Sequence, residues 1–116
     1  MAFQTDSERA RMLGDTRSLM PEPPDGVALA ARLDEVRREG AIIHESRDIV
    51  GVTDIVCPIL AADGRAIACV TVAAVSRRSA PTDFVAVLAR LKLACAAIAH
   101  ELSGFAPPAA TRSTIR

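Results

Sequence analysis

The sequence contains few aromatic residues: three Phe, no Trp and no Tyr among its 116 residues. Proteins that bind single-stranded nucleic acid stack bases on aromatic side chains, so such a platform is not expected here. The charge is balanced as well, with 14 basic and 14 acidic residues and a formal net charge of zero. Because phosphate binding normally needs a basic face, this balance argues against nucleic acid as a direct partner.

Long apolar runs are also missing. No run approaches the ~20 residues of a membrane-spanning helix, and the N-terminal segment MAFQTDSERARML lacks the apolar core of a signal peptide. These absences predict a cytoplasmic protein without a membrane partner. The three cysteines are an odd number and do not suggest a disulfide framework.

Patterns of catalytic and metal-binding residues are absent too. No Cys-x-x-Cys or His-x-x-x-His spacing and no Gly-rich phosphate loop occurs, and the cysteines lie in apolar surroundings, which raise a thiol pKa. The sequence therefore predicts no catalytic residues, no metal, no cofactor and no enzyme activity.

Half of the residues are apolar, which suits one folded domain with a modest core. A capping-box pattern at Thr5–Glu8 predicts a short helix that ends near Gly14. Three prolines between Leu19 and Gly26 predict a loop. An amphipathic helix is expected over Val27–Arg38, with Gly40 ending it.

Three strands and a long helix are expected next. Ala41–His44 is a short strand candidate, and Gly51–Ala74 is a hairpin candidate. A linker is expected at Arg77–Pro81. Apolar residues at helical spacing then predict a helix over about Asp83–Leu102, with Thr82 or Ser79 as its N-terminal cap. The remaining residues, 105–116, are predicted to be a disordered tail. The order predicts an α+β fold: a small antiparallel sheet with the long C-terminal helix packed on it, and open edges that favour a homo-oligomer.

The hairpin, GVTDIVCPILAADGRAIACVTVAA, carries the most information. A two-residue turn at Asp63-Gly64 places Asp54 opposite Ala73, Val56 opposite Thr71 and Pro58 opposite Cys69. A four-residue turn over Ala61–Gly64 slips this pairing by two and leaves the faces unchanged. One face of the hairpin then consists of Ile55, Cys57, Ile59, Ala68, Val70 and Val72, which is core. The other face consists of Asp54, Val56, Pro58, Cys69, Thr71 and Ala73, and this mixture of polar and apolar groups is typical of a small-molecule pocket.

The chain resembles the C-terminal part of the effector-binding domain of IclR-family transcriptional regulators. The resemblance rests on the order and spacing of LDEVRREG at 33–40, GVTDIVCPI at 51–59, Asp63-Gly64, the strand at 68–73 and AAIAHELSG at 96–104. It implies that residues 1–104 are a partial, GAF-like domain that senses a small metabolite, in a chain with no winged helix-turn-helix of its own. Carried over position by position, the family's ligand-binding residues are His44, Val52, Asp54, Thr71 and Ala73.

Two positions depart from the family pattern. Ala73 stands where family members often have Ser, which removes a hydroxyl, and Asp54 stands where a neutral Cys is common. A carboxylate at that position disfavours an anionic ligand unless a cation or a proton intervenes.

Each of these residues also has a purely structural interpretation. Asp54 suits the solvated start of a strand, Thr71 suits a strand by its propensity alone, and His44 suits a surface position at a strand end. Two functions follow as hypotheses: a ligand-sensing or dimerising module of an IclR-type regulator, and a ligand-free interaction module or remnant that pairs through the open sheet edge. A hollow face at Asp54, Thr71 and Ala73 favours the first, whereas Leu88 and Leu91 filling that face would exclude it.

Overall fold

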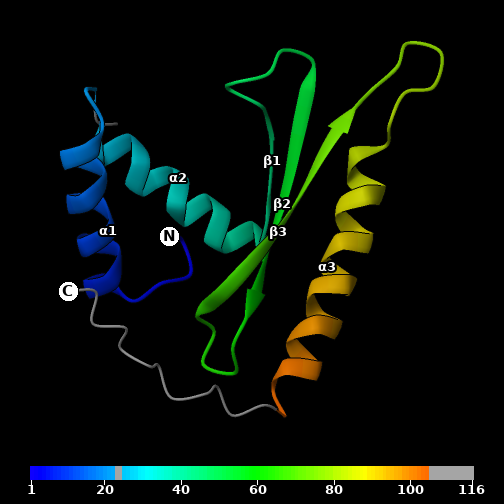
Figure 1. Ribbon diagram of the computed structural model, residues 1–116. Helices are drawn as coiled ribbons and strands as arrows, with labels where there is room; N and C mark the ends of the chain where they lie inside the picture. The colour runs from blue at the N-terminus through cyan, green and yellow to red at the C-terminus, as the bar shows by residue number, and fades with distance from the viewer. Residues whose placement is uncertain (23–24, 105–116) are drawn as a thin grey trace, which may run out of the picture.

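The computed structural model describes residues 1–22 and 25–104, and the tail predicted at 105–116 lies outside these residues. The described elements follow the order α1 (Asp6–Leu19), α2 (Gly26–Glu39), β1 (Ile42–Glu45), β2 (Val52–Leu60), β3 (Ala66–Val75) and α3 (Phe84–Leu102). Figure 1 shows α3 packed along a twisted three-stranded sheet, while α1 and α2 form an arm that stands away from it. The predicted α+β class, with a long C-terminal helix on a small antiparallel sheet, is confirmed.

Helix α1 begins as predicted and ends later than predicted. Thr5 caps it by accepting a hydrogen bond from the Glu8 amide at 3.3 Å. The expected end near Gly14 is wrong, because the helix continues to Leu19. A glycine inside a helix costs only about 1 kcal/mol relative to Ala, and Arg11 spans this position by pairing with Asp15 one turn later, at 3.1 Å, which recovers part of that cost. No residue of α1 is buried.

Helix α2 matches its predicted range closely. Asp25 caps its first turn, and Gly40 ends it in the left-handed conformation, with φ of +77°. Leu33 is the buried residue of the helix. A long ion pair of 3.9 Å between Arg9 and Asp34 links α1 to α2.

The strands pair antiparallel in the order β1-β2-β3. The predicted register of the hairpin is confirmed, with Asp54 opposite Ala73, Val56 opposite Thr71 and Pro58 opposite Cys69. The prediction of a two-residue turn at Asp63-Gly64, however, is wrong.

The turn spans Ala61–Gly64 and is closed by hydrogen bonds from the Gly64 amide to the Ala61 carbonyl and from the Ala61 amide to the Arg65 carbonyl, at 2.9 and 2.8 Å. The register shifts by one residue between Ile59 and Leu60, where Ile67 is an extra residue on β3. This bulge compensates for the longer turn and restores the predicted pairing from Ile59 onward.

The core lies between α3 and one face of the sheet. Its buried residues are Ala41, Ile55, Cys57, Ile59, Leu91 and Cys95. Helix α3 begins at an Asp83 cap, which accepts from the Val85 and Ala86 amides at 3.1 Å, so the expected caps at Thr82 and Ser79 are wrong. The side of the hairpin predicted to be core is therefore the side that α3 covers.

Candidate functional site on the uncovered sheet face

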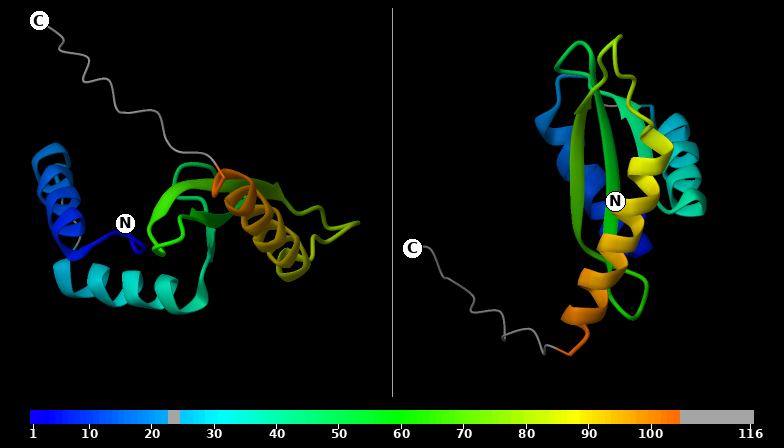
Figure 2. Two further views of the ribbon diagram at one scale, coloured as in Figure 1. Left: turned by 90° about the horizontal axis from the view of Figure 1, so that it is seen from below. Right: turned by 90° about the vertical axis from the view of Figure 1, so that its right-hand side faces the viewer.

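The five predicted ligand-binding residues lie on the sheet face that α3 leaves uncovered. Leu88 and Leu91 pack in the core on the opposite face, against the side of the sheet that carries Ile55. In the left view of Figure 2, α3 lies on one side of the sheet and α1 stands off on the other, with the N-terminal residues between α1 and the strands. The helix side chains that would have excluded a pocket are thus absent from this face.

Strand pairing sets three of the predicted residues in one row across the sheet. His44 of β1 lies opposite Asp54 of β2, and Asp54 lies opposite Ala73 of β3. The next row places Thr71 opposite Val56, which in turn faces Ile42. Val52 lies one row to the other side, opposite Val75. The structure therefore brings His44, Asp54, Thr71 and Ala73 together in adjacent rows, with Val52 at their border.

These side chains differ in exposure and in hydrogen bonding. His44 and Asp54 are half-buried, whereas Thr71 and Ala73 are exposed. The Nδ1 atom of His44 is buried and has no hydrogen-bond partner within the described part of the chain. A buried polar atom without a partner costs free energy, so Nδ1 is a destabilising feature of the folded chain.

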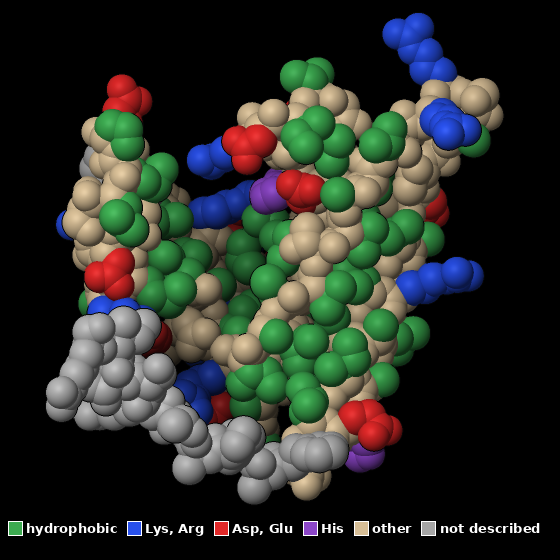
Figure 3. Space-filling model, in the orientation of Figure 1, with side chains coloured by type: hydrophobic (Ala, Val, Ile, Leu, Met, Phe, Trp, Pro, Cys, Tyr) green, Lys and Arg blue, Asp and Glu red, His purple; other side chains and the backbone are tan. Residues whose placement is uncertain are grey.

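The space in front of this face is hollow. Figure 3 shows a recess between α1 and the sheet, with apolar side chains along its walls and Lys or Arg side chains at its upper end, beside a His. Helix α2 lies at one side of this recess and is joined to β1 through Gly40 and Ala41. The recess is open to solvent, because α1 buries no residue against the strands.

Val52 also belongs to a cavity at the end of the sheet. This cavity has a volume of about 420 Å³ and is lined by Glu45, Ser46, Val50, Gly51, Val52, Thr53, Ser76 and Phe84. Its walls are the β1–β2 loop and the start of α3. It therefore lies at the strand ends, on the side where α3 begins, and is separate from the rows that contain Asp54 and Thr71.

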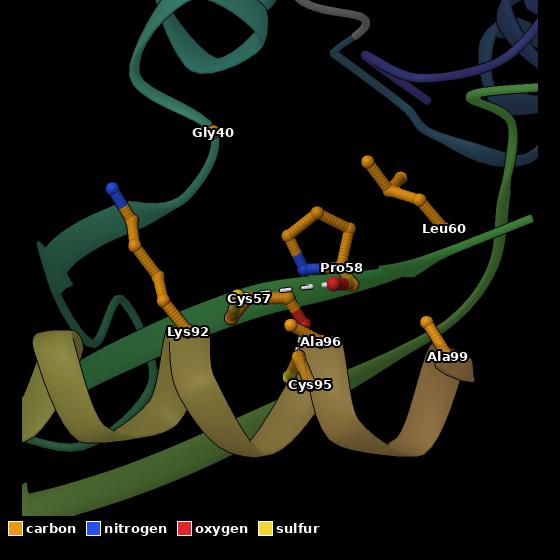
Figure 4. Close-up of a pocket in the computed structure, with 8 residues that line it drawn as sticks. All are labelled: Gly40, Cys57, Pro58, Leu60, Lys92, Cys95, Ala96 and Ala99. Carbon is orange, nitrogen blue, oxygen red and sulfur yellow. Dashed lines mark hydrogen bonds between the residues drawn. The ribbon is translucent and has the colours of Figure 1, made fainter. Parts of the chain in front are cut away.

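A second cavity of about 420 Å³, between α3 and β2, escaped the sequence reasoning. It exists because β1 pairs with β2 only as far as Val56, which leaves the following residues of β2 without a neighbour on that side. Its lining residues are Gly40, Cys57, Pro58, Leu60, Lys92, Cys95, Ala96 and Ala99. Lys92 extends from α3 toward Gly40 at one end of this cavity (Figure 4), and its Nζ donates to the Glu39 carbonyl at 2.9 Å. The only sign of this cavity in the sequence was the short length of the first predicted strand.

Two cysteines lie next to each other in the wall of this second cavity. The Cys95 thiol donates to the Cys57 carbonyl at 3.7 Å (Figure 4). Burial, together with a hydrogen bond to Cys95, raises the pKa of the Cys57 thiol to about 11. Since the thiolate is the reactive form, Cys57 is held in an unreactive state at neutral pH.

Within residues 1–22 and 25–104, no group of three or more His, Cys, Asp or Glu side chains is placed to hold a metal ion. None of the described helices is long and apolar enough to cross a membrane.

The fold resembles that of a solved regulator. The crystal structure of the transcriptional regulator YaiJ matches with a TM-score of 0.65 and 20% sequence identity, over 92% of this chain and 62% of that one. This chain thus spans less than two thirds of the length of the regulator's structure. No protein-family model and no curated protein matches the chain. At this level of identity the likeness establishes the fold alone.

Proposed function

We propose that this chain is a regulatory module related to IclR-type transcriptional regulators, one that binds a small metabolite on its uncovered sheet face and acts as a homo-oligomer in the cytoplasm. In this role it catalyses no reaction and makes no direct contact with nucleic acid. The observation that carries the proposal is the row of His44, Asp54 and Ala73 facing an open recess, in a fold shared with a transcriptional regulator.

The charges on this face define the class of ligand. Asp54 is a hydrogen-bond acceptor when ionised, Thr71 both donates and accepts, and His44 is a half-buried imidazole beside them. No Lys or Arg is within salt-bridge distance of Asp54 among the described residues. A ligand with amine or hydroxyl donors and apolar parts suits these groups, whereas a carboxylic acid is repelled by Asp54.

A thermal-shift screen with millimolar amines, polyols and carboxylic acids tests this function. A ligand that binds the folded state raises the melting temperature by mass action. We expect amines or polyols to stabilise the chain, and Asp54→Asn to remove that effect. The matched control is Asp48→Asn, which changes an exposed carboxylate in the β1–β2 loop and leaves the response intact.

The second candidate function is a ligand-free interaction module that pairs through the sheet edge. The observation in its favour is the apolar, uncharged sequence of β3, AIACVTVAAV, along one side of the sheet. A screen in which no compound of any class raises the melting temperature would contradict the sensing function and support this one.

A further inference from the structure

Among residues 1–22 and 25–104, no segment pairs with the outer edge of β3 beyond its first residue, so most backbone groups along that edge have no partner there. The Ser46 amide donates to the Val52 carbonyl at 2.8 Å, which directs the backbone groups of the even-numbered residues of β2 toward β1. The odd-numbered residues of β2 therefore pair with Ala68, Val70, Val72 and Ala74 of β3. By alternation, Cys69, Thr71 and Ala73 direct their amides and carbonyls to the outside of the sheet.

The N-terminal segment covers only the first residue of this edge. The Ala66 amide donates to the Phe3 carbonyl at 3.2 Å, and Gln4 donates from its side chain to the Ala66 carbonyl at 2.9 Å. Ala66 faces outward because the bulge at Ile67 reverses the alternation. The contact demonstrates that a backbone can dock on this edge, and it leaves residues 67–75 open, a stretch with Thr71 at its centre.

The open stretch lacks the features that normally protect an exposed edge. Between Ala66 and Val75 there is no charged residue, no proline and no glycine. Ile67 and Val75, at its two ends, are 54% and 65% exposed. Natural proteins cover or charge such edges, since they otherwise pair with another strand.

We propose that a second copy of this chain covers the edge, with β3 pairing antiparallel to β3 of the partner about a two-fold axis at Thr71. This rests on the homo-oligomeric part of the proposed function and is independent of ligand binding. A two-fold at Thr71 sets the two Thr71 residues opposite each other, Cys69 opposite Ala73, and Ile67 opposite Val75. Every facing pair is neutral, and the partner strand ends where Phe3 begins to cover Ala66.

This pairing also extends the candidate site. Thr71 and Ala73 lie on the uncovered face, so the dimer joins the two faces across a continuous six-stranded sheet. The hydroxyl of Thr71 then lies beside that of the partner copy, where Thr–Thr pairs form hydrogen bonds across strands. Each recess thereby acquires a second wall from the other copy.

Light scattering coupled to size exclusion, on the full chain at tens of micromolar, measures the mass directly. We expect twice the 12.2 kDa of one chain. Thr71→Pro removes an amide that points out of the sheet and is not used for pairing with β2. We expect this variant to have the mass of a monomer. Its far-ultraviolet circular dichroism is expected to match that of the wild type, which shows that it folds. Thr71→Val keeps the amide and is expected to remain dimeric. A wild-type protein of single mass would overturn the proposal.

Crosslinking tests the register without a disruptive substitution. Ala73→Cys places a thiol opposite Cys69 of the partner, within the 4.4–6.8 Å between Cα atoms that disulfides need. With diamide as the oxidant, we expect Ala73→Cys to form a covalent dimer, while the wild type and the double variant Cys69→Ser/Ala73→Cys do not. A dimer that shows no crosslink in Ala73→Cys uses another surface and would refute this pairing. The thermal-shift screen reads ligand binding separately, so the two proposals can fail independently.

Discussion

His44 of β1 lies directly opposite Asp54 of β2, on the face of the sheet that no helix covers. The pair stands at the centre of the predicted ligand-binding residues, and the Nδ1 atom of His44 is buried without a hydrogen-bond partner among the described residues. A histidine that neither forms an ion pair with its neighbour nor faces open solvent at Nδ1 contributes little to the folded state by itself. The contribution of His44 to protein stability and its role in ligand binding can therefore be separated by experiment.

His44→Leu is expected to leave the free energy of unfolding unchanged or to raise it, by up to about 1 kcal/mol, because it removes a buried polar atom without a partner. Urea unfolding of the ligand-free protein measures this change. In the ligand screen the same variant is expected to lose part of the shift in melting temperature. A fall of more than about 1 kcal/mol in the ligand-free protein would instead assign His44 a purely structural role.

Leu91→Ala is expected to lower the free energy of unfolding by about 2 to 5 kcal/mol, since Leu91 lies in the core between α3 and the sheet. Leu93→Ala is the matched control, because the same substitution two residues later removes a side chain that is 73% exposed. That control is expected to change stability by no more than about 0.5 kcal/mol. Chemical unfolding of both variants measures the difference, and equal losses would contradict the observed orientation of α3.

Alkaline unfolding should report the buried thiol at Cys57. Its pKa is about 11 in the folded state, raised from an ordinary value of 9.0. Below pH 9 the thiol is protonated in both the folded and the unfolded states, so its contribution to stability is fully present. As the pH rises from 9 to 11 the unfolded chain loses this proton first, and stability falls. The melting temperature of the wild type, measured across that range, is therefore expected to fall more steeply than that of Cys57→Ala. Parallel curves for the two proteins would show that the Cys57 thiol does not contribute to the pH dependence of stability.

Gly64→Ala is expected to destabilise the hairpin by about 1 to 2 kcal/mol, because Gly64 has a φ of +82° that a side chain with Cβ disfavours. No atom lies within 4 Å of the position that the new Cβ would take, so the cost is conformational and not steric. Gly64→Asn is the control, since Asn tolerates this conformation better than Ala does. Thermal unfolding should rank the wild type above Asn and Asn above Ala. An Ala variant as stable as the wild type would indicate a different turn.

Much of the fold could be predicted because side-chain alternation in strands is insensitive to small errors. The assignment of Asp54 and Thr71 to one face needed only the period of two, so it survived a mistaken turn. Predicting the length of the turn required knowing whether Ile67 pairs with β2 or forms a bulge. The sequence around Ile67 carries no signal that distinguishes these two arrangements. Helix α1 passes Gly14 because the cost of one glycine is small and the pairing of Arg11 with Asp15 recovers part of it, a balance too fine for pattern reasoning.

The arrangement around the candidate site was harder to predict. The stripe of Leu29, Leu33 and Val36 indicates that α2 has an apolar side, but the stripe does not specify what covers it. The recess depends on how the arm of α1 and α2 leaves the sheet, which no local pattern encodes. The cavity at Lys92 depends on the length of β1, whose range was predicted one residue too early.

The bulge at Ile67 and the turn at Ala61–Gly64 balance each other residue for residue. A deletion of one residue from either segment alone would turn Thr71, Ala73 and every later side chain of β3 to the opposite face, with the polar groups against α3. A deletion in one segment is tolerated only with a matching change in the other. In related sequences, a change in the length of the turn should accordingly be accompanied by a matching change at the bulge. The number of residues between Asp54 and Thr71 should therefore change only by even numbers.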